Sequence, residues 1–255
     1  MTDTQTLDTQ AVTAYLSRHL PGFHGPVEAV KFDVGQSNPP FLLKTPARNY
    51  VLRRKPPGVL LKSAHAVDRE YRVQKALAGT KGPVAEMYLL CEDDSGIGSA
   101  VYVMSHVEGR NIRQPSMEGF SNATRHAVID EMNRVLAELH MVDVEAVGLG
   151  DYGPEGNYYE RQIARWIKQY RASETEPVAA MDRLIAELPK RMPPEDGQRT
   201  LVHGDYRIDN MIFEHDGSAC LAVLDWELST TGHPYADLAS VIMQWQMPEG
   251  REGRG

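Results

Sequence analysis

Short apolar runs separated by turn residues dominate the first part of the chain, and this pattern predicts strands. The runs are Val27–Phe32, Phe41–Lys44, Tyr50–Arg53, Ala85–Cys91 and Ala100–Met104. Two segments, 7–20 and 64–78, instead repeat apolar residues at helical spacing. We therefore expect a small antiparallel β unit that contains one helix and follows an N-terminal helix.

After about residue 107 the apolar positions recur mainly at helical spacing. The pattern predicts helices over 127–140, 157–170 and 177–188, and a last helix that begins near Tyr235. Between them, Thr200–Leu224 returns to short strands and tight loops. The expected class is α+β with two lobes: a β-rich lobe over 1–106 and a mainly helical lobe over 107–255, with a hinge near 105–110.

Composition and charge narrow the possible partners. The chain has 255 residues, of which 42% are apolar, so it can form a globular core. Its net charge of −8 argues against general nucleic-acid binding, which needs positive charge against phosphate. The polar, acidic N-terminus and the lack of a ~20-residue apolar run argue against a secretory signal or membrane span. With only Cys91 and Cys220, we expect a reduced, cytoplasmic protein.

The densest cluster of polar residues lies in one loop and at the end of the next strand. The segment His203–Asn210 reads His-Gly-Asp-Tyr-Arg-Ile-Asp-Asn, and Asp225 ends the apolar run Leu221–Leu224. Kinases use an Asp to accept the proton of an attacking hydroxyl, and an Asn with a second Asp to bind Mg²⁺. Magnesium suits this set because it prefers oxygen ligands and retains much of its water. The pattern favours phosphoryl transfer.

This motif resembles the Brenner motif and the metal-binding Asp of the aminoglycoside phosphotransferase (choline-kinase-like) family. The resemblance covers nearly the whole chain and implies a bilobal protein-kinase-like fold with ATP and Mg²⁺ as cofactors. It makes Asp205 the catalytic base and Asn210 with Asp225 the metal ligands. It also implies that His203 orients the loop and that Asp237 bonds to it, and His140 is interpreted as a packing or loop-bonding histidine.

The family resemblance also assigns a phosphate-binding cation and its acidic partner. Arg53 stands on the third strand where a Lys is usual, and Glu70 follows on the next helix. Arginine binds phosphate with a planar fork rather than a point charge. The alternatives are a solvent-facing Arg53, with Arg54 and Lys55 as competitors, and an exposed helical Glu70.

Two backbone features of the nucleotide site follow from the same resemblance. Gly35, Ser37 and Asn38 match the loop that covers the nucleotide, although the loop has fewer glycines than usual. Tyr102–Gly109 matches the hinge, where the Ser105 carbonyl and the Val107 N–H are expected to bond adenine.

Three further segments resemble one subgroup more closely: Tyr50–Gly58, Ser63–Tyr71 and Tyr158–Trp166. This subgroup comprises kinase-like domains fused to, or encoded beside, acyl-CoA dehydrogenases. The resemblance implies a small hydroxylated acceptor of hydroxyacyl-CoA type rather than an aminoglycoside, and a functional association with an acyl-CoA dehydrogenase.

Two other functions remain open from the sequence. A metal-dependent hydrolase is the first, since His203, Asp205, Asp225, His215 and His233 include plausible ligands. The second is a non-catalytic module that binds a nucleotide or acyl-CoA, which the unusual Arg53 would suit.

Family members normally continue well beyond the position of Asp237. The resemblance therefore implies that the C-terminal helices are truncated and the helical lobe is incomplete. In that case we expect Leu238, Val241, Ile242 and Trp245 to lack packing partners.

Overall fold

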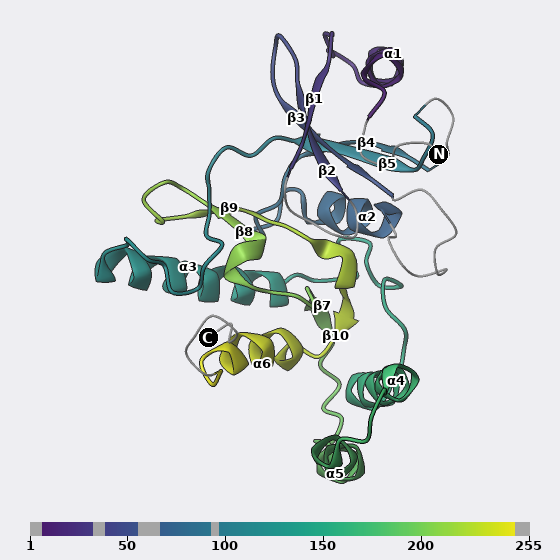
Figure 1. The fold of residues 1–255 in the computed structure, drawn as a ribbon, viewed down its shortest axis with the longest axis vertical. Helices are drawn as coiled ribbons and strands as arrows, with labels where there is room; N and C mark the ends of the chain where they lie inside the picture. The colour runs from purple at the N-terminus through teal and green to yellow at the C-terminus, as the bar shows by residue number, and fades with distance from the viewer. Residues whose placement is uncertain (1–6, 33–38, 56–66, 93–96, 248–255) are drawn as a thin grey trace.

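A five-stranded antiparallel sheet forms one end of the protein (Figure 1). The computed structural model describes residues 7–32, 39–55, 67–92 and 97–247. The strands are β1 (Glu28–Lys31), β2 (Pro40–Lys44), β3 (Tyr50–Arg54), β4 (Met87–Cys91) and β5 (Val101–Ser105). Their order is β1-β2-β3-β5-β4, so β3 is central and has neighbours on both sides. Every residue of β3 is buried.

One helix lies on each side of this sheet. Helix α1 (Thr9–His19) packs Val12 and Leu16 into an apolar cluster with Leu43 and Leu52. Helix α2 (Val67–Leu77) lies between the sheet and the rest of the protein, as Figure 1 shows. Because β3 and α2 are both fixed by burial, the polar residues they carry have defined positions.

The second part of the chain is built on a long helix and short strands. Its elements are β6 (Arg110–Asn111), α3 (Asn122–His140), β7 (Thr200–Val202), β8 (Met211–Phe213), β9 (Cys220–Val223), β10 (Thr230–Gly232) and α6 (Tyr235–Gln244). A short 3₁₀ turn at Ile208–Asn210 precedes β8, and another at Trp226–Leu228 follows β9. Strand β8 lies between β6 and β9, and β7 pairs with β10. The fully buried Trp226 belongs to the core that these elements share with α3.

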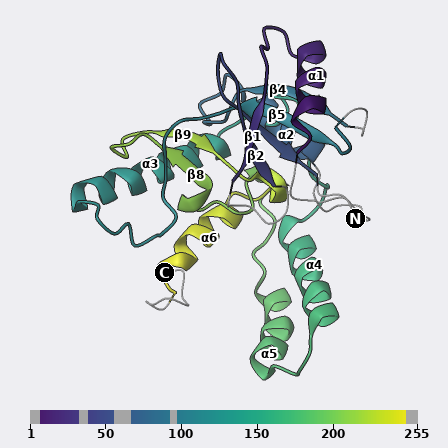
Figure 2. The ribbon, with the colours of Figure 1, turned by 45° about the horizontal axis from the view of Figure 1, so that its top comes forward.

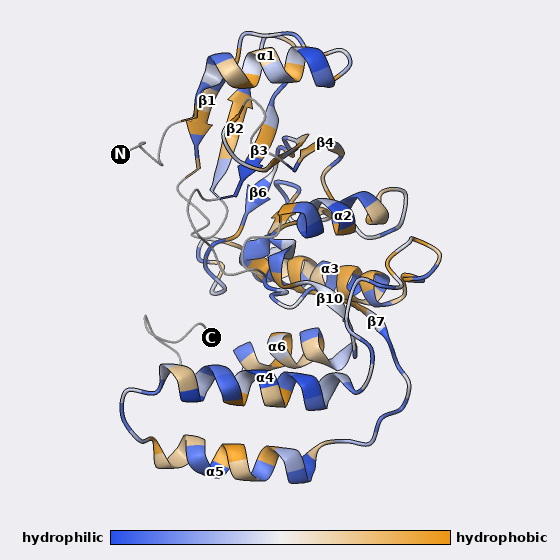
Figure 3. Cartoon of the chain, turned by 90° about the vertical axis from the view of Figure 1, so that its right-hand side faces the viewer, coloured by the Kyte–Doolittle hydropathy of each residue, from blue (hydrophilic) through white to orange (hydrophobic). Residues whose placement is uncertain are grey.

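Helices α4 (Tyr158–Ser173) and α5 (Ala179–Glu187), with the 3₁₀ turn Leu188–Arg191, form a hairpin that projects from the body (Figure 2). We call residues 158–191 the arm. Figure 3 shows it as an outer layer beyond α6, with apolar and polar positions on both helices. Neither α4 nor α5 buries a side chain, and Trp166 is 59% exposed.

The predicted elements agree with the structure in type and order, and differ at some ends. Helix α3 begins at Asn122 rather than 127, because Ser121 caps it by accepting a hydrogen bond from the Thr124 N–H. Of the four apolar residues expected without partners, Leu238, Ile242 and Trp245 are exposed by 36%, 51% and 67%. Val241 differs because it packs against the α3 core. No helix within the described ranges is both long and apolar enough to cross a bilayer.

Candidate active site

The loop after β7 is held in place by the carboxylate of Asp237 at the start of α6. Asp237 is 1% exposed, and its two oxygens accept hydrogen bonds from the backbone N–H groups of His203 and Gly204, both at 2.8 Å. His140, the last residue of α3, contacts the same carboxylate at 3.2 Å. The loop-bonding role predicted for Asp237 agrees with these contacts. His140, predicted to be a packing or loop-bonding histidine, contacts the carboxylate that bonds the loop.

Gly204 is required by the shape of this loop. Its φ is +85°, in the left-handed region that favours glycine. A Cβ at this position would also lie 2.7 Å from the carbonyl oxygen of Leu228. Any side chain here would therefore move the residue that follows, Asp205.

His203 is buried beneath the loop and is neutral. Burial lowers the pKa of its imidazole, and this outweighs the opposing effect of the nearby Asp237. Its Nδ1 accepts from the Asp205 N–H at 3.2 Å, so the proton on Nε2 donates to the Leu224 carbonyl at 2.9 Å. Both ring nitrogens are engaged with backbone groups, which fits an orienting role.

Asp205 and Asn210 contact each other directly. The Asn210 amide nitrogen donates to the Asp205 carbonyl at 2.9 Å and to its carboxylate Oδ2 at 3.0 Å. Both amide hydrogens are thus used, which leaves Asn210 Oδ1 as an acceptor. The side chain of Asp205 remains 34% exposed, so the carboxylate is accessible to a substrate.

Asp225 is brought to the same place by the strand before it. The Leu224 N–H donates to the Asn210 carbonyl at 2.8 Å, and the Val223 N–H donates to the Pro83 carbonyl at 2.9 Å. Asp225 itself has φ 64° and ψ 61°, a left-handed conformation in which Asp and Asn are the best-tolerated residues after Gly. This backbone turn ends the strand and begins the Trp226–Leu228 turn.

Arg53 connects the sheet to this centre. Its guanidinium is 3.2 Å from Glu70 Oε2 through Nη1 and 3.2 Å from Asp225 Oδ1 through Nη2. Arg53 is 8% exposed and Glu70 0%, and the Tyr102 hydroxyl also donates to Glu70 at 2.8 Å. Burial lowers the pKa of Arg53, but Tyr102, Glu70 and Asp225 outweigh it and raise the pKa overall.

These contacts rule out the two alternatives left open by the sequence, a solvent-facing Arg53 and an exposed Glu70. Arg53 is not solvent-facing, and Glu70 points inward. Arg54 instead lies over the Phe41 ring at 5.5 Å, and the Lys55 backbone N–H bonds to the Ala100 carbonyl.

The remaining predicted nucleotide-site residues lie at one end of the sheet or outside the described ranges. Ser105 ends β5, and the half-buried Val107 packs against the apolar cluster that includes Tyr102 and Met104. Their adenine-bonding roles remain predictions. Gly35, Ser37 and Asn38 fall in the segment 33–38, outside the described residues.

The phosphotransferase enzyme family matches residues 28–255, which is most of the chain and includes every predicted site residue. This chain belongs to that family. A crystal structure assigned by name to the aminoglycoside phosphotransferases, from Ralstonia eutropha JMP134, is 51% identical with a TM-score of 0.88. The alignment covers 98% of this chain and 73% of that one. The predicted family and the kinase-like, bilobal α+β fold are thereby confirmed.

More distant structures share the fold. Aminoglycoside phosphotransferase APH(4)-Ia, in a ternary complex with ADP and hygromycin B, has a TM-score of 0.65 at 17% identity. The alignment covers 91% of this chain and 76% of that one.

Curated relatives carry this phosphotransferase domain as one part of a longer protein. Mouse acyl-CoA dehydrogenase family member 10 is 45% identical over 96% of this chain, which spans 23% of that protein. Human acyl-CoA dehydrogenase family member 11 is 43% identical over 94% of this chain, which spans 31% of that protein. The chain therefore corresponds to about a quarter to a third of each relative.

The donors of this candidate site fit magnesium better than zinc. Asn210 Oδ1 and the Asp225 carboxylate are hard oxygen ligands. In the described ranges, no group of three or more His, Cys, Asp or Glu side chains is placed to hold a metal. His203 has both ring nitrogens engaged, and His215 is exposed in the β8–β9 turn. The hydrolase ligand set does not converge.

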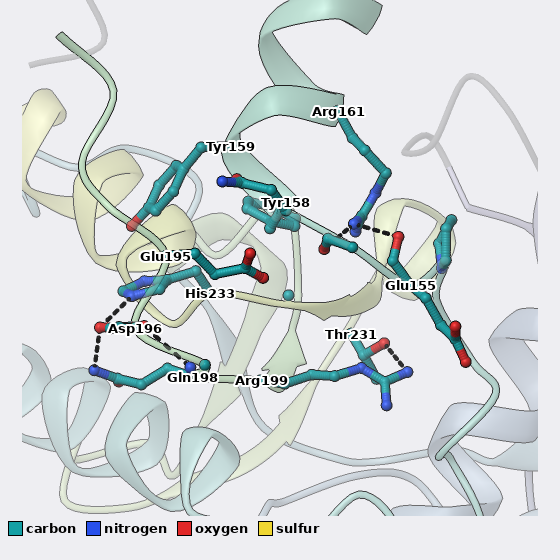
Figure 4. Close-up of a pocket in the computed structure, with 15 residues that line it drawn as sticks. Glu155, Tyr158, Tyr159, Arg161, Glu195, Asp196, Gln198, Arg199, Thr231 and His233 are labelled. Atoms are coloured by element: carbon teal, nitrogen blue, oxygen red, sulfur yellow. Dashed lines mark hydrogen bonds and ion pairs between the residues drawn. The ribbon is translucent and has the colours of Figure 1, made fainter.

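A separate cavity of about 320 Å³ lies at the other end of the β7–β10 pair (Figure 4). Gly232, which pairs with Thr200 at the start of β7, lines it together with Tyr158. The arginines that line this cavity are already hydrogen-bonded to the protein. Arg161 donates to the Glu155 carbonyl at 2.8 Å, and Arg199 donates to the Thr231 hydroxyl at 3.0 Å. His233 pairs with Asp196 at 3.3 Å. These contacts argue against a phosphate site there.

Sequence analysis missed two residues that contact the candidate site. Tyr102 supports Glu70, and its signal would have been a polar hydroxyl on a central strand next to β3. Arg207 forms ion pairs with Asp205 at 3.0 Å and with Asp209 at 3.2 Å. The alternation of acidic and basic residues in His203–Asn210 was the available signal.

Proposed function

We propose that this chain is an ATP- and Mg²⁺-dependent kinase that transfers the γ-phosphoryl group to a hydroxyl of a small metabolite. Asp205 is the base, Asn210 and Asp225 hold the metal, and Arg53, held by Glu70, binds the phosphates. The β-rich lobe, 1–106, supplies the nucleotide contacts at Gly35, Ser37, Asn38, Ser105 and Val107. The helical lobe, 107–255, supplies the chemistry.

One observation carries this proposal: an unbroken series of contacts links all five chemical residues. Asp205 bonds Asn210, the Asn210 carbonyl bonds the residue before Asp225, and Asp225 pairs with Arg53, which pairs with Glu70. The series joins β3 to a residue 172 positions away. A buried cation between two carboxylates, bonded through the backbone to a loop that carries an Asp–Asn pair, is the arrangement that phosphoryl transfer needs.

The reaction needs only modest covalent chemistry from the protein. Asp205 accepts the proton of the acceptor hydroxyl while the hydroxyl oxygen forms a bond to the γ-phosphorus. The bond from the γ-phosphorus to the β–γ bridging oxygen breaks, and ADP leaves. Bound Mg²⁺ supplies neutralisation of phosphate charge. The chain's own residues then position the groups, which is the larger part of catalysis in such enzymes.

The acceptor we propose is a hydroxyacyl-CoA or a related hydroxy acid. The support is the setting of the relatives, in which this domain accompanies a protein named for acyl-CoA dehydrogenation. Two domains joined in one protein are expected to act on related substrates, and the substrate of an acyl-CoA dehydrogenase is an acyl-CoA. We propose the same association, fused or between separate proteins, for this chain.

The test is turnover of ATP by the purified chain with hydroxyacyl-CoA thioesters, free hydroxy acids and an aminoglycoside as separate acceptors. We expect Mg²⁺-dependent ADP formation with the first class. Asp205→Asn and Asp225→Asn should each lower kcat by about 10²–10⁴-fold, the usual contribution of a positioned base or comparable group. Both variants keep the side-chain shape, and Asn suits the left-handed backbone at 225.

Unchanged turnover in both variants would contradict the kinase proposal. The non-catalytic module gives a different result: Mg-ATP raises the melting temperature of the wild-type chain, but no acceptor is phosphorylated. Turnover with the aminoglycoside alone would retain the kinase and reject the hydroxyacyl acceptor.

A further inference from the structure

Arg207 is placed to act on the proposed base, and nothing in the motif assigns it a role. It lies in the same loop as Asp205, with its side chain 23% exposed. Its Nε is 3.0 Å from Asp205 Oδ1, and its Nη2 is 3.2 Å from Asp209 Oδ2. The Nε–H does not point at the Asp205 oxygen, so this contact is an ion pair rather than a hydrogen bond.

The two oxygens of the Asp205 carboxylate are therefore contacted by two different residues. Asn210 donates to Oδ2, and Arg207 faces Oδ1. Two restraints of this kind fix the plane of the carboxylate, which a single contact would leave free to turn. Each oxygen still has a lone pair for a hydroxyl proton.

The charges nearby show why the restraint matters. Asp205 is hydrogen-bonded to Asn210, a proposed metal ligand, so the carboxylate is next to the metal site. A free carboxylate is a better ligand for a hard divalent cation than an amide oxygen. Without an opposing cation, Asp205 would turn toward the metal and stop acting as a base.

We propose that Arg207 is a positioning residue that keeps Asp205 away from the metal and directed at the acceptor hydroxyl. This inference rests on the proposed function. It predicts that losing Arg207 lowers kcat and, at the same time, tightens divalent-metal binding. A residue that only stabilised the loop would lower kcat and weaken metal binding together.

The experiment measures Mn²⁺ affinity by electron paramagnetic resonance, with no acceptor present, alongside kcat with Mg-ATP and the best acceptor. For Arg207→Met we expect kcat to fall at least about tenfold, within the ~10²–10⁴-fold that a positioned base supplies. The Kd for Mn²⁺ should fall severalfold. Arg207→Lys should restore part of kcat, because it returns the charge without the fork.

The matched control is Arg171→Met on the arm. Arg171 also bridges two carboxylates, Glu174 at 2.9 Å and Asp182 at 2.6 Å, far from the loop. It should change neither quantity. The double variant Asp205→Asn with Arg207→Met should lose the gain in Mn²⁺ affinity, because the added ligand is then an amide.

Weaker or unchanged Mn²⁺ binding in a folded Arg207→Met would overturn the proposal, as would full retention of kcat. Circular dichroism of each variant establishes that it is folded. A wild-type chain that phosphorylates no acceptor would instead reject the proposed function, so the two failures are distinguishable. The metal measurement remains informative in that case.

Discussion

Two arginines of this chain, Arg53 and Arg171, make the same kind of contact in regions that are built differently. Arg53 bridges Glu70 and Asp225 in the buried centre, and its partners lie 17 and 172 residues away. Arg171 bridges Glu174 and Asp182 on the arm, where all three side chains are partly exposed to solvent. The first contact joins separate elements, whereas the second joins neighbours along one hairpin.

The difference shows in which region side chains are fixed by contacts with distant parts of the chain. In the centre, Arg53 and Asp237 are each held by groups from distant segments: Arg53 by Glu70 and Asp225, and Asp237 by the N–H groups of His203 and Gly204. On the arm, apolar residues such as Trp166 and Leu184 face solvent in the described structure, and ion pairs are local. Substitutions should therefore have large effects in the centre and small effects on the arm.

The largest effect is expected from Arg53→Met compared with Arg171→Met. Removing Arg53 leaves the fully buried Glu70 without its cation, which should lower the free energy of unfolding by about 3–5 kcal/mol. The Arg171 variant should lose about 0–1 kcal/mol, since its partners are exposed. Urea unfolding followed by circular dichroism measures both. Equal losses would remove the distinction between the two regions.

A smaller loss of stability is expected when the pH is lowered, because His203 is buried. Its pKa in the folded state is lowered by burial, so below about 6.5 the unfolded chain binds a proton that the folded protein does not. Stability should therefore decline as pH falls below this value, by at most about 1.4 kcal/mol per pH unit from this residue.

The measurement compares wild type with His203→Gln by urea unfolding from pH 7.5 to 5. The wild-type stability should decline more steeply over that range, because only it carries the buried imidazole. Parallel curves would mean that His203 is protonated without penalty.

The smallest effect is expected from Trp166→Ala. This side chain is 59% exposed, and the guanidinium of Arg165 lies over its ring, with the guanidinium carbon 5.6 Å from the ring centroid. The free energy of unfolding should change by no more than about 0.5 kcal/mol, as for exposed positions generally. A loss as large as that of Arg53→Met would show that the arm is packed more tightly than its exposure indicates.

Much of this arrangement could be predicted from the sequence because local patterns specify it. The turn-bounded apolar runs predicted the five strands, and the family resemblance predicted Glu70 on the following helix as the acidic partner of Arg53. The first turn of α3 escaped prediction because it is polar, and a capping residue, Ser121, supplies its signal instead.

The rest depends on contacts that no local pattern encodes. The spacing within His203–Asn210 indicated a base and a metal ligand, but not that Arg207 would face the base. Arg53 was predicted to pair with Glu70, whereas its second partner, Asp225, comes from the other end of the chain. The exposure of Trp166 was equally hidden, because an aromatic residue on an amphipathic helix also fits a core.

The hydrogen bond from Val223 to Pro83 has a mechanical consequence. Together with the Arg53–Asp225 pair, it fastens the strand that ends at Asp225 to the sheet end of the molecule. Asp205 is fastened to the opposite side, because the N–H groups of His203 and Gly204 bond to Asp237 on α6. Leu224 is also bonded to that loop, through the Asn210 carbonyl and the His203 ring. The segment just before Asp225 therefore couples the sheet end of the molecule to the loop that carries Asp205.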